Sequence, residues 1–162
     1  MRRLAFLLPA FVALGFAATA AQAQTVKVAI GGDLEREARE LGEREVRDQA
    51  DRLAQVVTEE LRDRGVLAGA QIDLTLTDLK PNRPTFNQVA SRPGLDPFHS
   101  RSIGGATIEG EILTADGQRI PVRYDWYSGS LADVLGYNTW QDAERTFERF
   151  ADNLAEGRYV TR

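Results

Sequence analysis

The sequence predicts an α+β fold in which an antiparallel or mixed sheet of about four strands is covered on one face by a long N-terminal helix and a C-terminal helix. One observation is that four short runs alternate apolar and polar residues, as strands with one solvated face do. The other is that two longer runs repeat apolar residues every three or four positions, which is the spacing of one helix face. Such helices bury their apolar stripes against a sheet.

The N-terminal part of the chain is predicted to form one strand and one long helix. The strand covers 25–30 and ends at two glycines. A charged helix then runs from the N-cap Asp33 to residue 64, where Gly65 supplies the C-terminal turn. The apolar stripe of its second half comprises Val46, Ala50, Leu53, Val57 and Leu61. Its first half contains Gly42, which costs about 1 kcal/mol relative to alanine inside a helix, so we expect this half to fray or to project from the core.

Three further strands are predicted after this helix. One covers 72–77, and the other two, 106–113 and 120–126, form a hairpin because Asp116 and Gly117 supply positive-φ turn chemistry between them. Pro121 cannot donate a ladder hydrogen bond, which places the last strand at the edge of the sheet or at a bulge.

Two helices are predicted at the C-terminal end. Ser130 precedes a short helix at 131–135. A capping box of Thr139 and Asp142 then begins a longer helix that ends at Gly157. The apolar face of that helix comprises Trp140, Ala143, Phe147, Phe150 and Leu154.

The first 23 residues have the features of a cleavable secretory signal peptide. Two arginines precede an uncharged apolar run, and a small-x-small pattern ends at Ala23. We therefore expect a single α+β domain at 24–162, located in the periplasm or secreted after cleavage near Ala23. The chain has no cysteine, which excludes disulfides and a lipidated cysteine, so no stable membrane anchor is predicted.

The charge of the chain limits its partners. Cleavage would remove two arginines and leave 18 basic against 24 acidic residues. This balance argues against a protein that binds nucleic acids or anionic membranes over its whole surface. Any site for an anion must be local.

A long proline-rich loop at about 80–105 is the candidate for such a site, because loops of this length without periodicity are uncommon in compact domains unless they are functional or disordered. Four cations stand in it against the single acid Asp96, a net charge of +3. The residues predicted to bind an anionic ligand or a partner are Lys80, Arg83, Arg92, His99 and Arg101. Arginine matches carboxylate and phosphate geometry through paired hydrogen bonds. The alternative is that these cations only pair with acids of the long helix.

No catalytic residue, metal site or cofactor is predicted. His99 is the only histidine, which excludes a histidine cluster for zinc. Ser100 and Ser102 lie near it and Asp96 lies three residues before it, so that His99 as base, Asp96 as orienter and a serine as nucleophile would form a set by residue type. However, the members of such sets normally come from different elements, so a surface histidine is the preferred interpretation.

Three stretches of the sequence, 81–86 (PNRPTF), 93–96 (PGLD) and 102–106 (SIGGA), resemble a pattern in small exported bacterial proteins that are described only as hypothetical. The resemblance implies a periplasmic envelope accessory domain and no particular activity. The leading hypothesis is a non-catalytic envelope or periplasmic binding module that takes an envelope protein or an anionic ligand through the cationic loop. The alternatives are a small secreted hydrolase and a self-assembling structural protein in which the charged helix at 34–61 pairs with a second copy; the oligomeric state is left open.

Overall fold

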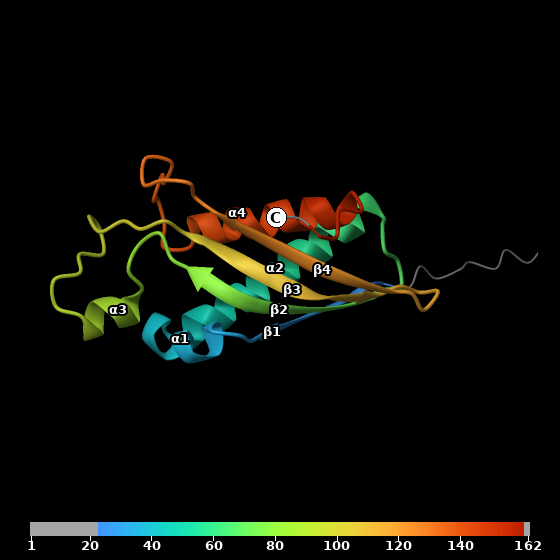
Figure 1. Ribbon diagram of the computed structural model, residues 1–162, viewed down its shortest axis with the longest axis horizontal. Helices are drawn as coiled ribbons and strands as arrows, with labels where there is room; N and C mark the ends of the chain where they lie inside the picture. Colours follow the sequence, from blue (N-terminus) through green and yellow to red (C-terminus); the bar gives the residue numbers. More distant parts are fainter. Residues whose placement is uncertain (1–22, 161–162) are drawn as a thin grey trace, which may run out of the picture.

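The computed structural model describes residues 23–160, and it has the predicted α+β fold (Figure 1). The predicted signal peptide, apart from Ala23, lies outside the described residues. The elements in chain order are β1 (Thr25–Ile30), α1 (Leu34–Leu41), α2 (Glu43–Arg64), β2 (Gln71–Lys80), α3 (Phe86–Ser91), β3 (Gly105–Leu113), β4 (Arg119–Tyr127) and α4 (Gln141–Ala155).

The four strands form one mixed sheet in the order β1-β2-β3-β4. β1 pairs in parallel with β2, since α1 and α2 carry the chain back across the sheet, and the other two pairings are antiparallel. The predicted hairpin is confirmed as β3 and β4. Pro121 lies on β4, an edge strand, as its missing N–H predicts.

The core lies between one face of this sheet and the two longer helices. α2 contacts β1, α4 contacts β3 and β4, and the two helices contact each other (Figure 1). Leu53 of α2, Phe147 of α4 and Ile108 of β3 are fully buried there. The opposite face of the sheet is polar and carries ion pairs between neighbouring strands. In one of them, Nη1 of Arg123 lies 3.1 Å from Oε1 of Glu109.

The single long helix predicted at 33–64 is wrong, because the chain breaks at Gly42 into α1 and α2. Gly42 has φ 102° and ψ 107°, a conformation outside the helical region. The expectation that the first half frays or projects is also wrong. Leu34, Ala38 and Leu41 of α1 are buried in the same core as α2, so the break lets a second short helix turn its apolar face inward.

Two predictions near the C-terminus are also corrected. Residues 131–135 form a turn followed by irregular chain rather than a helix, although Ser130 and Asp133 make a side-chain hydrogen bond of 2.8 Å. α4 begins at Gln141 with no side-chain cap, so Thr139 is not an N-cap. The carboxylate of Asp142 instead bonds to residues of two loops described below.

Candidate functional site

The predicted loop at 80–105 contains a short helix, α3. Thr85 and Gln88 form a capping box that starts α3, a local signal in the sequence that the long-loop prediction passed over. The amide of Asn87 donates to the backbone carbonyls of Arg39, at 2.6 Å, and Glu40, at 3.1 Å. These carbonyls belong to the last turn of α1 and have no partner within the helix, so α3 is held against the end of α1.

Asn82 fastens the beginning of the same segment to α4. Its side chain is fully buried, donates to the carboxylate of Asp142 and accepts from the Asp142 backbone N–H at 2.8 Å. Its backbone N–H donates to the carbonyl of Thr139 at 2.7 Å, and its carbonyl accepts from the N–H of Ser102 at 2.9 Å. One residue therefore joins both ends of the segment to the start of α4.

A second loop, at 128–140, is bound to this segment. Ser128 donates its hydroxyl to the Asp142 carboxylate and its N–H to the carbonyl of Gly104, the latter at 3.0 Å. A Cβ at Gly104 would lie 2.6 Å from the side-chain amide of Asn82, so the two ends of segment 80–105 approach each other as closely as glycine allows. The two loops form one body around the buried pair of Asn82 and Asp142.

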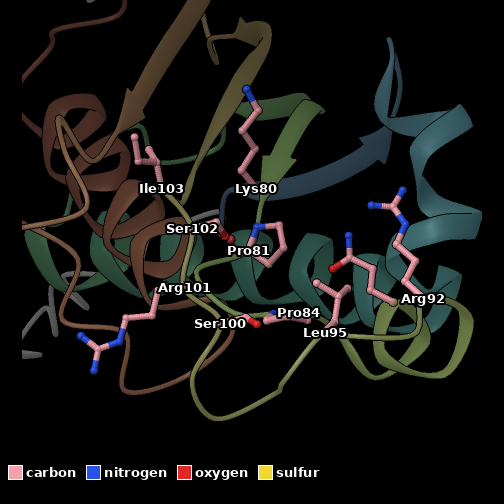
Figure 2. A pocket seen from close by; sticks show the side chains of 10 residues that line it. Lys80, Pro81, Pro84, Arg92, Leu95, Ser100, Arg101, Ser102 and Ile103 are labelled. Carbon is pink, nitrogen blue, oxygen red and sulfur yellow. The ribbon is translucent and has the colours of Figure 1, made fainter.

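A hollow of about 300 Å³ opens between the end of β2 and this segment (Figure 2). Pro81, Pro84, Leu95 and Ile103 supply apolar surface to it, and Ser100 and Ser102 supply hydroxyls. The Ser102 hydroxyl already donates to the carbonyl of Pro81. This volume is at the lower end of the roughly 300–1,000 Å³ that ligand pockets have.

Three of the predicted site residues, Lys80, Arg92 and Arg101, also line the hollow. Figure 2 shows that their charged ends point away from one another, so the cations surround the hollow instead of meeting at one point. Whether they act on one ligand stays a prediction.

Two of these three cations already have acidic neighbours. Arg92 forms an ion pair with Glu40, an acid of the predicted long helix. Lys80 Nζ lies 3.5 Å from a carboxylate oxygen of Asp78 and 5.0 Å from the centre of the Tyr127 ring. Arg101 has no ion pair within residues 23–160, which leaves its guanidinium the most available of the three for a ligand.

The other two predicted site residues lie outside the hollow. The Nε atom of Arg83 is buried and has no hydrogen-bond partner among the described residues. His99 has an 86% exposed side chain, and its Nδ1 lies 2.8 Å from the carboxylate of Asp96. This hydrogen bond, together with the N–H groups of Phe98 and His99, lowers the pKa of Asp96 to about 2.

The contact between Asp96 and His99 has the form of an orienter and a base, but no hydroxyl completes it. The Ser100 hydroxyl accepts a hydrogen bond from the Asp96 N–H at 3.1 Å, and in the part of the chain that the structure describes no serine bonds to His99. An open position in water also lacks the fixed donors that stabilise an oxyanion. The three residues are arranged as a hydrogen-bonded turn.

Tyr127 is a polar contact near the hollow that the sequence did not indicate. Its hydroxyl donates to Asp78 at 2.7 Å and contacts the hydroxyl of Thr107 at the same distance. Burial, followed by the hydrogen bond to Asp78, raises the pKa of Tyr127, so it stays a neutral donor. This hydrogen bond holds the carboxylate that pairs with Lys80.

No family model matches the chain, and no curated protein matches it either. Between residues 23 and 160, no three His, Cys, Asp or Glu side chains are grouped so that they could hold a metal ion. The helices of the same region include none that is long and apolar enough to cross a membrane.

Proposed function

We propose that the protein is a non-catalytic accessory module of the bacterial envelope, periplasmic or secreted, that binds an anionic envelope component at the hollow beside segment 80–105. The observation that carries this proposal is the combination of apolar surface inside the hollow with three cations around it. Apolar lining with a few polar groups is the usual composition of a ligand site. The signal peptide predicted at 1–23 and the resemblance to exported proteins support the proposed location.

The chemistry of the hollow indicates the class of ligand. Pro81, Leu95 and Ile103 offer contact to a short hydrocarbon part, whereas Arg101 offers paired donors to a carboxylate or phosphate. A ligand that carries both parts would use both kinds of surface. A free inorganic anion would contact only the cations, and an uncharged hydrocarbon would contact only the apolar surface of the hollow.

Nuclear magnetic resonance titration with hexyl phosphate tests the proposal. The amide signals of Leu95, Arg101 and Ile103 should shift, and inorganic phosphate or hexanol alone should produce much weaker changes. Arg101→Gln should weaken binding by roughly tenfold, the effect of losing one hydrogen bond to a charged group. Arg119→Gln is the matched control, since Arg119 is an exposed arginine at the far end of β4 that pairs with Glu111. Shifts spread over the whole surface, or equal affinity in both variants, would contradict the proposal.

The two alternatives, a small secreted hydrolase and a self-assembling protein, can each be distinguished from the proposed function by one measurement. The hydrogen bond between Asp96 and His99 is the feature that favours a small secreted hydrolase. A turnover that is lost in His99→Ala, with the circular dichroism spectrum unchanged, would favour that alternative. A self-assembling protein would elute as an oligomer in size-exclusion chromatography, whereas a binding module acting alone would elute as a monomer.

A further inference from the structure

The large apolar side chains that remain exposed are concentrated on two loops. These loops are segment 80–105 and the loop at 128–140. Their exposed apolar side chains are those of Phe86, Phe98, Ile103, Leu131, Leu135 and Tyr137, and we call this set the loop-end surface. Within the described residues the only other large exposed apolar side chain is Val160. Figure 1 shows both loops at the end of the molecule opposite the turn between β3 and β4. Large exposed apolar side chains that gather at one end of a molecule point to an interaction site, whereas scattered single ones do not.

The fold holds in place the two loops that carry these side chains. Asn82 and Ser128 fasten the two loops to Asp142, and a Cβ at Gly136 of the second loop would lie 3.5 Å from the side chain of Arg101 in the first. The apolar residues are therefore exposed on an ordered support. A support that is already ordered loses less conformational entropy when it binds.

The charge of the same end selects the partner. Segment 80–105 has a net charge of +3 and the loop at 128–140 holds one acid, Asp133, so the two loops together have a net charge of +2, whereas the remainder of the chain after residue 23 has an excess of acids. An anionic surface would attract this end and repel the rest. The interaction is therefore oriented, which agrees with the argument that the whole protein is no general binder of anionic membranes.

We propose that the loop-end surface docks reversibly on an anionic lipid bilayer. Phenylalanine and leucine side chains would enter the boundary of the acyl chains, Tyr137 would lie at the headgroup level, and the cations would contact lipid phosphates. The inference rests on the proposed function, because the hollow beside Arg101 would receive one lipid headgroup.

The shape of the surface favours a bilayer over an acidic protein. Phe86, Phe98 and Tyr137 are 86%, 71% and 77% exposed, so little of each side chain is packed against the rest of the protein. Side chains that dominate protein interfaces are packed in complementary pockets. A bilayer accepts protruding aromatic side chains without a complementary shape.

Cosedimentation with vesicles tests the inference. The protein is produced by export, and all variants share one N-terminus, so any contribution from residues 1–23 is common to them. Vesicles of phosphatidylcholine with an equal amount of phosphatidylglycerol should bind the protein, and vesicles of phosphatidylcholine alone should bind it much more weakly. Binding should weaken as salt rises above about 0.15 M, where the screening length is about 8 Å.

The variants separate the two kinds of contact. Arg101→Gln should reduce vesicle affinity roughly fivefold, the usual effect of one basic residue near an anionic membrane. The double change Phe86→Ser and Phe98→Ser should reduce it by at least about tenfold, since both side chains would lose apolar burial. Arg119→Gln and Val160→Ser are the controls, one cation and one exposed apolar residue outside the loop-end surface, and should bind as the unaltered protein does. Circular dichroism of each variant verifies that it is folded.

The outcomes distinguish the inference from the proposed function. If hexyl phosphate binds in the hollow but neither vesicle binds, docking on lipid is wrong and the proposed function stands. If polyglutamate binds in its place and the same variants abolish that binding, the surface serves an acidic protein and the inference fails. Vesicle binding that is equal in all variants would place the contact elsewhere and also overturn it. If neither hexyl phosphate nor vesicles bind, both proposals fail.

Discussion

Asn82 is the residue on which the geometry of the candidate site depends most directly. Its amide group uses both its donor and its acceptor on Asp142, in a position without access to water. A buried carboxylate requires such partners, because an unpaired one has a large desolvation penalty. The same side chain determines where segment 80–105 leaves β2 and where it returns to β3, and so shapes the hollow.

Asn82→Ala should reduce the free energy of unfolding by roughly 1–3 kcal/mol, since it removes hydrogen-bond partners from a buried group. Hydrogen exchange at the Ser102 amide, which Asn82 holds, should become faster. Asn87→Ala is the matched control: it removes two exposed hydrogen bonds that water replaces, so its effect on stability should be smaller. Chemical denaturation of both variants measures this, and equal losses would show that the buried network has no special role.

The residues of the site were predictable from the sequence to different degrees. Lys80, Arg92 and Arg101 could be identified because a local excess of charge is visible in one segment. Asn82 and Asp142 could not be paired, because they are 60 residues apart and only the folded chain brings them together. Pro81, Pro84, Leu95 and Ile103, which supply the apolar surface of the hollow, could not be grouped from the sequence, since periodicity does not report a surface depression.

Gly42 shows at the scale of an element how one position divides a helix. A helical pattern runs on both sides of it, and periodicity alone cannot reveal a break that lasts one residue. Backbone hydrogen bonds nevertheless connect Gly42 to both helices. The Gly42 N–H donates to the carbonyl of Ala38 at 2.8 Å, and its carbonyl accepts from the N–H of Val46 at 3.0 Å. α1 can therefore end and α2 begin around the same residue.

Gly42→Ala should destabilise the protein by roughly 1–3 kcal/mol, the cost of a sparsely populated backbone conformation for a residue with a Cβ. In a continuous helix the same change would stabilise it by about 0.5–1 kcal/mol, so the sign of the effect decides between the two structures. Steric exclusion is not the cause, because the nearest atom to an added Cβ would be 3.5 Å away. Denaturant midpoints measure the effect, with Arg47→Ala at an exposed position of α2 as a control that should change little.

The strands were predicted more accurately than the turns. Alternation with a period of two is a local property, and β1, β3 and β4 lie within a residue or two of their predicted ranges. The helix expected at 131–135 had a local capping signal, yet Leu131 and Leu135 are exposed and bury nothing. A helix this short needs tertiary packing for its stability, and the signal at Ser130 serves a turn.

In the whole molecule, the large apolar side chains lie in two separate places. Those of the strands and of α1, α2 and α4 meet in one layer between the sheet and the helices. Those of the two loops remain in contact with water at one end. The sequence predicted the layers, because each stripe identifies its own buried face. It did not predict that the two loops lie at the same end, because the bonds from Ser128 to Gly104 and from Asn82 to Thr139 are not visible in either loop alone.

Two phenylalanines allow this division to be measured with the same chemical change. Phe147 of α4 is fully buried between the helices and the sheet, whereas the side chain of Phe86 projects from α3 into water. In the chain beginning at Gln24, Phe147→Ala should reduce the free energy of unfolding by about 3–5 kcal/mol, since it removes buried apolar contacts and leaves a cavity. Phe86→Ala should change it by less than about 0.5 kcal/mol, because an exposed side chain loses little on truncation. The order should be reversed for vesicle affinity: Phe86→Ala, which stays folded, should lose more affinity than Phe147→Ala. A large loss of stability in Phe86→Ala would mean that this side chain belongs to the core, and its exposure could then no longer support a role in docking.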